Sequence, residues 1–408
     1  MNTEQLLAEA EELNGELVRH RRHLHAHPEL GMELPETKSY VMSVLWEYGC
    51  EPEECGTGGV AVLLGGRKPG KVMLLRADMD ALPLTEESGV DYVSETAGRM
   101  HACGHDNHTA MLLGAAKLLK RHEAELAGTV KLLFQPGEET LEGAKAMIEA
   151  GVLENPKVDA ALSFHDIAGS PVKEGAFGVF GPGAAYASTD WFEVRIKGVG
   201  GHGAAPEWTH DPLGAMCAVY QGIHEIMAEH RSPFEACTMT VGKMQSGTTG
   251  NIIPETALMQ GTIRAFNEKT RERLKADLAQ LVEYTGMAKG VEAKLVFGSE
   301  CPPLFVDAGV QESVLTSLRE LFGENAYDLR TKWNGAYAQN TSSEDFAFIA
   351  QKVPSAFGWI FLGDSREGRK YCCHNPKVLF NDAYLYRGAA AYAKAAYDWL
   401  ERAAAEYA

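Results

Sequence analysis

The chain has 408 residues, of which 45% are hydrophobic and 23% charged, as expected of a globular protein with a sizeable core. Its length fits two domains, or one large domain that carries an insertion. The 38 basic and 56 acidic side chains give a formal net charge of −18, which repels phosphate groups. This charge argues against a nucleic acid or an anionic membrane as a partner.

The sequence shows no signal for export or for membrane insertion. No run approaches the ~18 consecutive apolar residues of a membrane-spanning helix. The start of the chain, residues 1–17, is rich in Glu and helical in pattern, unlike a secretory signal. The eight cysteines are scattered without the spacing of a disulfide framework, which indicates reduced thiols. We therefore expect a cytoplasmic protein.

Strands and helices alternate in the first part of the chain. Residues 71–75 and 130–134 are short apolar runs bounded by turn residues, as is typical of strands buried on both faces of a sheet. Between them, residues 109–122 carry apolar side chains at helical spacing, and residues 144–150 repeat that pattern. The alternation predicts an α/β fold.

The pattern changes after residue 183 to the order βαββαβ, which is that of a split ferredoxin-like domain. The elements expected in this order are residues 191–197, 211–230, 237–243, 256–266, 269–287 and 291–297. We therefore predict an inserted domain over residues 186–298. Strand and helix alternation resumes after Cys301 and ends in an Ala-rich helix, so residues 1–185 and 299–408 together form a discontinuous catalytic domain.

The hexapeptide at residues 101–106 combines a thiol, two imidazoles and a carboxylate in one Gly-containing turn. Cys103 and His105 are two residues apart, and in a loop just before a helix both can turn toward one point. Such side chains bind first-row transition metals. Taken alone, a Cys-x-His pair is more often a packed thiol beside a capping histidine.

Glu138 and Glu139 follow an apolar strand and a Pro-Gly turn, where open α/β sheets usually carry function. Adjacent carboxylates repel unless a cation or a proton lies between them. A solvated acidic loop is the alternative interpretation. Beside a metal, one carboxylate can bind the ion while the other takes a proton from water and delivers it to the leaving nitrogen.

Two further histidines complete this set. His165 ends a second apolar run, and His374 lies in a polar turn before Pro376. Either one alone is more often a structural histidine than a ligand. Together with the thiol, the imidazole and the carboxylates, they predict a metal-dependent hydrolase.

Eight motifs, in order along the chain, resemble those of the M20 metallopeptidase family. More narrowly, they resemble its amidohydrolase branch of N-acyl amino acid, hippurate and indole-acetyl amino acid hydrolases. The similarity runs from about residue 21 to residue 393. The motifs lie at residues 76–83, 100–106, 134–139, 200–206, 251–254, 261–264, 343–346 and 374–376.

The resemblance implies a ligand set for two divalent metal ions, with Glu138 as general acid and base. The implied ligands are Cys103, His105, Glu139, His165 and His374. One soft thiolate among harder ligands leaves Mn²⁺ or Zn²⁺ as the first candidates and Co²⁺ or Ni²⁺ as alternatives. The family fold is a zinc-peptidase-like catalytic domain with a small lid that often dimerises, so we expect a homodimer or a higher homo-oligomer through residues 186–298.

The resemblance also assigns residues to the substrate. His202, in the lid, matches a histidine that steadies the developing oxyanion in related enzymes. Asn251 and Arg264 are candidates for binding a substrate carboxylate, because the Arg fork matches that anion. A structural amide and a surface ion pair are their alternatives. Asp80 and Asp106 would orient the ligands.

Some residues leave the pocket's specificity open. Asp166 follows His165 where the branch is usually more apolar, and Glu207 stands where a second histidine is common. Cys372 and Cys373 abut His374, and either could compete as a ligand, although packing or redox sensitivity is the favoured interpretation.

We therefore expect a metal-dependent amidohydrolase that cleaves the amide of a small N-acyl amino acid, releasing a carboxylic acid and an amino acid. A dipeptidase or a diaminopimelate-type N-acetyl-amino-acid deacetylase is the nearer alternative. A non-catalytic binding protein, or a redox protein that uses Cys103 as its nucleophile, is the alternative from a different class.

Overall fold

The computed structural model describes residues 1–405 and divides into two compact units. Unit 1 comprises Met1–Ala185, Phe305–Gln339 and the chain from Asp345 onward, and unit 2 comprises Tyr186–Leu304 with Asn340–Glu344. The first division falls where the sequence analysis placed it, whereas residues 299–304 and 340–344 lie in unit 2. No helix among residues 1–405 is both long and apolar enough to cross a membrane.

Unit 1 is built on an eight-stranded mixed sheet, so the α/β class predicted from the sequence is confirmed. The strands, in spatial order, are β1 (Glu53–Cys55), β2 (Gly59–Gly65), β4 (Thr129–Gln135), β3 (Val72–Asp78), β5 (Ala160–Ile167), β16 (Ser355–Phe361), β6 (Phe177–Val179) and β15 (Ala326–Asp328).

The three central strands β4, β3 and β5 run parallel, and β16 continues the parallel pairing. Almost every residue of these strands is buried, which explains their continuous apolar runs.

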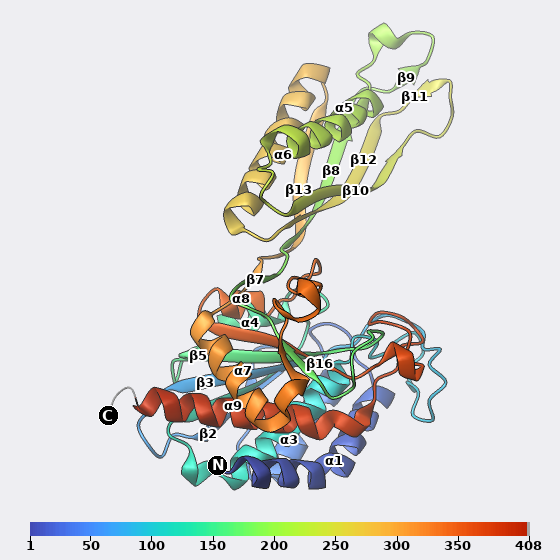
Figure 1. Ribbon diagram of the computed structural model, residues 1–408. Coiled ribbons are helices and arrows are strands. Elements are labelled where there is room, and N and C mark those ends of the chain that lie inside the picture. The colour runs from blue at the N-terminus through green and yellow to red at the C-terminus, as the bar shows by residue number, and fades with distance from the viewer. Residues whose placement is uncertain (406–408) are drawn as a thin grey trace. The chain divides into compact units, whose positions relative to one another are not determined.

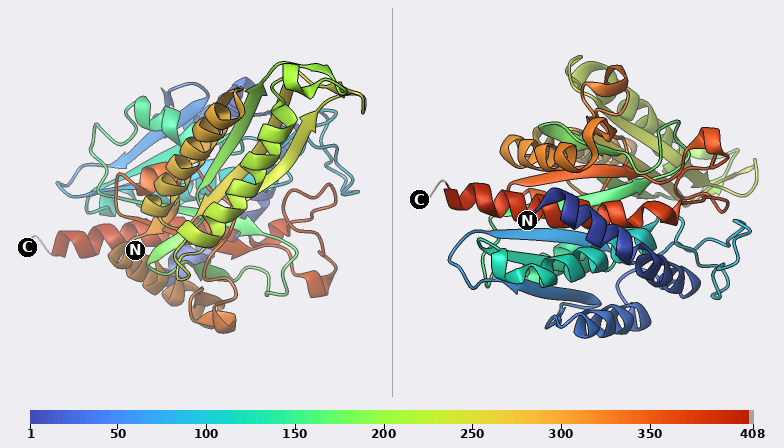
Figure 2. Two further views of the ribbon diagram at one scale, coloured as in Figure 1. Left: turned by 90° about the horizontal axis from the view of Figure 1, so that it is seen from above. Right: turned by 60° about the horizontal axis from the view of Figure 1, so that its bottom comes forward.

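Helices cover the sheet of unit 1. Helices α1, α3 and α9 pack against one another, and α3 and α9 also contact the sheet at β3; Figure 1 and the right panel of Figure 2 show the three helices together. The helices of unit 1 are α1 (Thr3–Ala26), α2 (Pro35–Glu47), α3 (His105–Arg121), α4 (Gly143–Glu149), α7 (Ala308–Phe322), α8 (Ala347–Ala350) and α9 (Leu385–Ala405). The helix predicted to start at residue 109 starts at His105, directly after Gly104, whose left-handed backbone ends the preceding turn.

Parallel pairing brings the carboxyl ends of β3, β4 and β5 to one edge of the sheet. Each of these ends carries polar side chains. Asp78 ends β3, Glu138 follows β4 after a turn at Gly137, and His165 lies near the end of β5. Segments far apart in the sequence therefore meet at one place.

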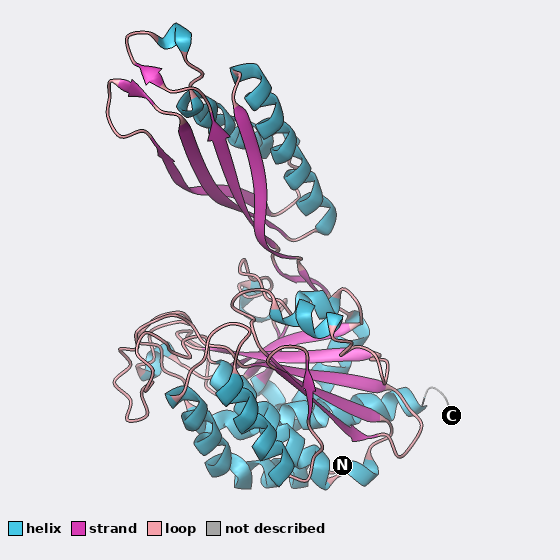
Figure 3. Cartoon of the chain, turned by 180° about the vertical axis from the view of Figure 1, so that it is seen from behind, coloured by secondary structure: helices cyan, strands magenta, loops and turns pink. Residues whose placement is uncertain are grey.

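Unit 2 has the predicted βαββαβ order. Its elements are β8 (Thr189–Lys197), α5 (Pro212–Glu225), β10 (Cys237–Ser246), β12 (Thr256–Ala265), α6 (Glu268–Lys289) and β13 (Glu292–Cys301). The antiparallel sheet has the order β10-β12-β8-β13, and α5 and α6 lie side by side against it (Figures 2 and 3). A ribbon of β9 (Gly201–His202) and β11 (Ile252–Ile253) extends from it. The chain enters unit 2 through β7 (Gly183–Tyr186) and leaves it through β14 (Leu304–Val306).

Tyr392 of α9 holds the strands together where β3 and β5 part. Its buried hydroxyl donates a hydrogen bond to the Arg76 carbonyl oxygen and accepts one from the Phe164 amide, each 2.8 Å long. Burial raises the pKa of Tyr392 above its usual range. The amide that it holds is next to His165, so this contact helps to fix the end of β5.

Replacing Tyr392 with Phe is expected to lower the free energy of unfolding by about 1–3 kcal/mol, because the buried Phe164 amide loses its acceptor. Urea unfolding followed by circular dichroism measures the change. Tyr397, on the same helix but only half-buried, is the matched control, and its change to Phe should shift the midpoint far less. Equal effects of the two changes would contradict the role of the Tyr392 hydroxyl.

Candidate metal centre

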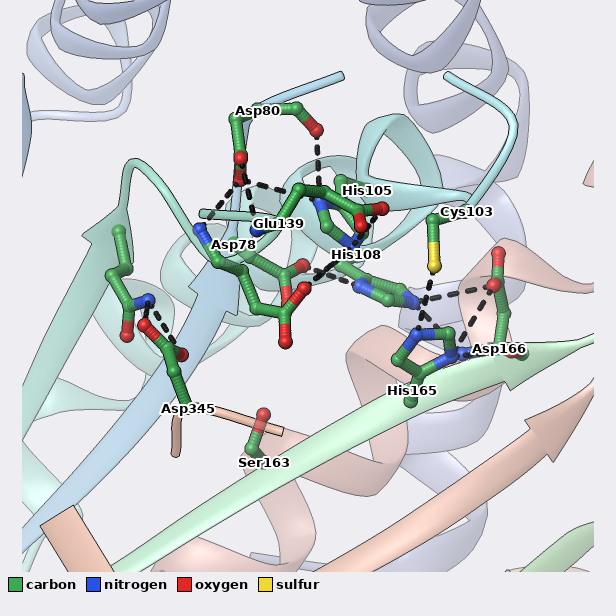
Figure 4. Close-up of polar contacts among 12 residues, drawn as sticks. Asp78, Asp80, Cys103, His105, His108, Glu139, Ser163, His165, Asp166 and Asp345 are labelled. Carbon is green, nitrogen blue, oxygen red and sulfur yellow. Dashed lines mark hydrogen bonds and ion pairs between the residues drawn. The ribbon is translucent and has the colours of Figure 1, made fainter. Parts of the chain in front are cut away.

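Five side chains from four segments of unit 1 converge at the carboxyl edge of the sheet. Figure 4 shows four of them, Cys103, His105, Glu139 and His165. The five form two overlapping groups, whose potential ligand atoms lie within 4.8 Å of one another and which share the sulfur of Cys103. The first group adds His105 and His165 to Cys103, and the second adds Glu139 and His374. These are the five residues that the sequence analysis selected as ligands.

The side chains of this cluster are in direct polar contact with one another. The Cys103 sulfur lies 3.2 Å from His374 Nε2 and 3.4 Å from His165 Nε2. His374 Nε2 is also 3.3 Å from a Glu139 oxygen. Burial acts to raise the pKa of Glu139, but the hydrogen bond from His374 and the charge of His105 lower it, which favours the carboxylate.

Two buried atoms of the cluster test whether a metal fits. Within residues 1–405, His105 Nε2 has no hydrogen-bond partner. Glu139 Oε1 faces two imidazole nitrogens, His374 Nε2 at 3.3 Å and His105 Nε2 at 4.0 Å. Buried polar atoms are nearly always paired, and an unpaired one costs about 1–3 kcal/mol. Both atoms are electron-pair donors, as are the thiolate and the other imidazoles around them. A cation is the group that satisfies all of them at once.

Backbone carbonyls fix the histidine rings in the orientation that a ligand needs. His105 Nδ1 donates to the carbonyl oxygen of Asp80 at 2.8 Å, and His165 Nδ1 donates to that of Asp166 at 2.5 Å. Because the proton is held on Nδ1, the lone pair of Nε2 points into the cluster.

Gly104 makes the turn between Cys103 and His105 possible. Its φ of +89° lies in the left-handed region, and α3 begins at the next residue. A Cβ atom at this position would lie 2.2 Å from the carboxylate oxygens of Asp166, so no side chain fits. The thiol and the imidazole therefore leave the turn on the same side.

Asp80 positions the two glutamates and not only His105. Its buried carboxylate accepts hydrogen bonds from the backbone amides of Glu138 and Glu139, at 3.0 and 3.1 Å. Its carbonyl oxygen, and not its carboxylate, accepts the 2.8 Å bond from His105. Glu138 is itself buried, with one oxygen 3.9 Å from His105 Nε2, so it faces the same cluster as Glu139.

Asp106 was expected from the sequence to orient the ligands, but its side chain contacts α1 instead. Its carboxylate lies 2.7 Å from Arg21 Nε and 2.8 Å from His25 Nδ1, both on α1. Burial acts to raise the pKa of Asp106, but these two partners lower it below its usual range. Asp106 therefore ties the first turn of α3 to α1, because consecutive helical residues point in different directions, about 100° apart.

Sequence analysis missed a buried chain of polar groups beneath the cluster. Asp78 accepts a 2.5 Å hydrogen bond from His108 Nδ1, and His108 Nε2 accepts one of 2.8 Å from the Asp166 amide. Asn107 donates to the Asp166 carboxylate at 2.6 Å. Two spacings could have revealed this chain. Asp78 precedes Asp80 by two residues, and His108 follows His105 by three, which is one helical turn.

Arg76 extends this polar chain to a distant segment. Its guanidinium lies 2.6 Å from Asp78 and 2.7 Å from Asp345, and all three side chains are buried. Asp345 also accepts from the Gln135 side chain and from the Ala144 amide. The motif residues 76–83 and 343–346 therefore meet in space.

The substrate candidates His202, Asn251 and Arg264 lie in unit 2. His202 is exposed, and its Nδ1 accepts a 3.0 Å hydrogen bond from the Ala204 amide, which leaves the ring proton on Nε2. Ile252 pairs with His202 across the β9–β11 ribbon, so Asn251 lies beside that histidine.

Arg264 lies at the other end of unit 2. It is near the end of β12, eight residues after Thr256, and a strand advances about 3.3 Å per residue. Asn251 precedes the start of that strand, so the two side chains are separated by roughly 25 Å along it. One copy of unit 2 cannot place Asn251 and Arg264 on the same carboxylate, in contrast to the grip expected from the sequence.

Known proteins resemble this chain over nearly its whole length. It is 34% identical to thermostable carboxypeptidase 2 of Saccharolobus solfataricus, over 96% of this chain and 97% of that one. It is 33% identical to hippurate hydrolase of Campylobacter jejuni, over 97% of this chain and all of that one. A crystal structure from Bacillus subtilis, described as a dinuclear metal binding peptidase, superposes with a TM-score of 0.78 at 30% identity, over 96% and 99% of the two chains.

The model of peptidase family M20/M25/M40 matches residues 74–398. This range contains all five residues of the cluster, Glu138 and the whole of unit 2. The motifs, the fold and the relatives agree, and the chain belongs to peptidase family M20/M25/M40.

Proposed function

We propose that this protein is a metal-dependent hydrolase that cleaves the amide bond between an acyl group and an amino acid. The observation that carries the proposal is the pair of overlapping ligand groups that share Cys103, with Glu138 beside them. Hippurate is N-benzoylglycine, so one relative is named for this reaction, and a carboxypeptidase likewise releases an amino acid from an acyl group. A non-catalytic binding protein has no need for the buried Glu138.

Cys103, His105, Glu139, His165 and His374 would hold two divalent ions. Two groups of donors and one shared thiolate suit two ions, as in the relative described as dinuclear. When bound, such ions polarise an amide carbonyl and acidify water. Mn²⁺ and Zn²⁺ are the first candidates, and Co²⁺ and Ni²⁺ are the alternatives, because three imidazoles, a carboxylate and a thiolate bind all four.

Glu138 moves the proton in this proposal. Asp80 fixes the backbone of Glu138 and Glu139 together, so that the two carboxylates face the cluster from one turn. Glu139 is paired with His374, and Glu138, which is not assigned as a ligand, would accept a proton from the attacking water. It then delivers that proton to the leaving nitrogen, which must be protonated before the C–N bond breaks.

His202 would donate its Nε2 proton to the oxyanion, and Arg264 would bind the substrate carboxylate. Burial lowers the pKa of Arg264, but guanidinium remains charged at neutral pH and its Nη1 is already oriented by Ser343 at 3.4 Å. His202 and Asn251 lie at one end of unit 2 and Arg264 lies at the other. We therefore propose that His202 and Asn251 act on the site of a second copy of this chain.

The amino acid and the acyl group are not encoded in a readable motif. The carboxypeptidase relative favours peptides as a second substrate class, and an N-acetyl-amino-acid deacetylase is the other. A panel of N-benzoyl, N-acetyl and dipeptide substrates separates the three. We further propose a cytoplasmic location, because all eight cysteines are free and Cys217 and Cys372 are exposed, as a reducing compartment permits.

Replacing Glu138 with Gln is expected to lower kcat by roughly 10²–10⁴-fold, because the amide cannot carry the proton. Metal analysis of the purified variant should still find about two ions per chain, since Glu138 is not assigned as a ligand. Glu142→Gln is the matched control, because Glu142 is exposed four residues further on, and it should leave kcat unchanged. An active Glu138→Gln enzyme would refute the assigned role.

Removing the metal tests the ligand set separately. Dialysis against a chelator should abolish hydrolysis, and added Mn²⁺ or Zn²⁺ should restore it. His165→Ala should bind about one ion fewer per chain than the wild type, because a site of this kind does not tolerate the loss of an inner ligand. Full activity after chelation would favour thiol-only chemistry at Cys103 instead.

Mixing two inactive variants tests whether His202 acts across subunits. A dimer with one Glu138→Gln chain and one His202→Ala chain regains one intact site only if the histidine comes from the other chain. Random mixing should then restore about a quarter of the wild-type activity. No recovery, with heterodimers shown by native mass spectrometry, would place His202 at the site of its own chain.

A further inference from the structure

Cys373 is a free thiol beside the metal centre that the proposed reaction does not use. Its sulfur lies 3.9 Å from the carbonyl oxygen of Asp166, the residue that follows His165. The Cys373 side chain and burial both raise the pKa of the Cys103 thiol, as two neighbouring thiols do. Cys103 is buried, whereas Cys373 is partly exposed, so a reagent from solution reaches Cys373 first.

The backbone holds these two cysteines in register. The amide of His374 donates a 2.9 Å hydrogen bond to the carbonyl oxygen of Ala102. Cys373 precedes His374 and Cys103 follows Ala102, so this bond brings the two cysteines next to each other. His374 has a φ of +66°, so the chain turns sharply directly after Cys373. A disulfide needs Cα atoms within about 7 Å of each other, and a backbone hydrogen bond between the residues next to the two cysteines is a contact that can bring them that close.

The loop that carries Cys373 is also closely packed on its other side. A Cβ atom on Gly169 would lie 2.8 Å from the amide nitrogen of Cys372, so the loop contacts the segment after β5 directly. Cys372 itself is exposed. The two neighbouring thiols therefore differ in their surroundings. Cys373 lies beside the metal centre, and Cys372 is exposed to solvent.

We propose that Cys103 and Cys373 form a redox modification site, in which a peroxide or a small disulfide converts the two thiols to a Cys103–Cys373 disulfide. With hydrogen peroxide, the Cys373 sulfur takes one oxygen and becomes a sulfenic acid, and water leaves. The Cys103 sulfur then attacks that sulfur, the S–O bond breaks, and the S–S bond forms. In the metal-loaded chain Cys103 would be a thiolate, and the departing hydroxide takes a proton from solvent and becomes a second water. In the metal-free chain the proton of the Cys103 thiol goes to that hydroxide instead.

Oxidation of Cys103 would affect both ligand groups, because Cys103 belongs to each of them. A disulfide sulfur carries no charge and is a poor ligand, so oxidation withdraws the one donor that the two groups share. This step rests on the proposed metal centre. Oxidation should release metal and stop hydrolysis, and a dithiol reductant should restore both once metal is added back.

The test exposes the metal-loaded wild-type chain to hydrogen peroxide and follows three readouts. Peptide mapping without reduction should find Cys103 joined to Cys373. A chromogenic chelator should report the release of bound metal, and dithiothreitol with added Zn²⁺ should reverse the loss of activity. At the same peroxide dose, Cys373→Ser should release metal at least about tenfold more slowly.

Cys372→Ser is the matched control, because it removes the neighbouring exposed thiol and should behave as the wild type. A Cys372–Cys373 link, oxidation confined to Cys103, or equal metal release from Cys373→Ser would each overturn the proposal. Mapping is repeated on the chelator-treated chain, where the disulfide should still form. A wild-type chain that holds no metal but forms the disulfide would refute the metal centre and leave the redox pair standing.

Discussion

The structure depends on the pairing of a buried carboxylate, that of Asp78, beneath the metal centre. An unpaired charge at this depth would cost several kcal/mol, so its partners are part of the fold. Burial acts to raise the pKa of Asp78, but Arg76, His105 and His108 lower it well below its usual range. The pairing ties the end of β3 to the first turns of α3, the two elements between which Cys103 and His105 are placed.

The same pairing explains why distant motifs occur together. Arg76 cannot pair with Asp78 alone, because its guanidinium has five donors, and Asp345 and Gln135 satisfy the others. Asp345 is the first residue of unit 1 after the segment 340–344 of unit 2. The ion pairs of Arg76 with Asp78 and Asp345 therefore connect the residues beneath the metal centre to the point where the chain returns to unit 1.

The sequence predicted the elements well, and it selected five side chains that the fold brings together, because both leave periodic or compositional signals. Continuous apolar runs marked β3 and β4, and Cys, His and Glu marked the cluster. The partners of buried residues were harder to predict. Asp106 was expected to orient the ligands but pairs with Arg21. Asn251 and Arg264 were expected to bind one carboxylate, but Asn251 precedes β12 and Arg264 lies near its end. Such pairings depend on packing between elements, which spacing along the chain does not encode.

Gly104 and Asp166 also constrain how this site can change. The Asp166 carboxylate fills the space that a side chain at Gly104 would need, and Asn107 holds it there. A larger residue at position 104 therefore needs a smaller one at position 166, and it is strained even then because φ at this position is +89°. The change at position 166 in turn leaves Asn107 without its acceptor. Positions 104, 107 and 166 therefore change together, and the order of their substitutions decides whether an intermediate sequence still folds.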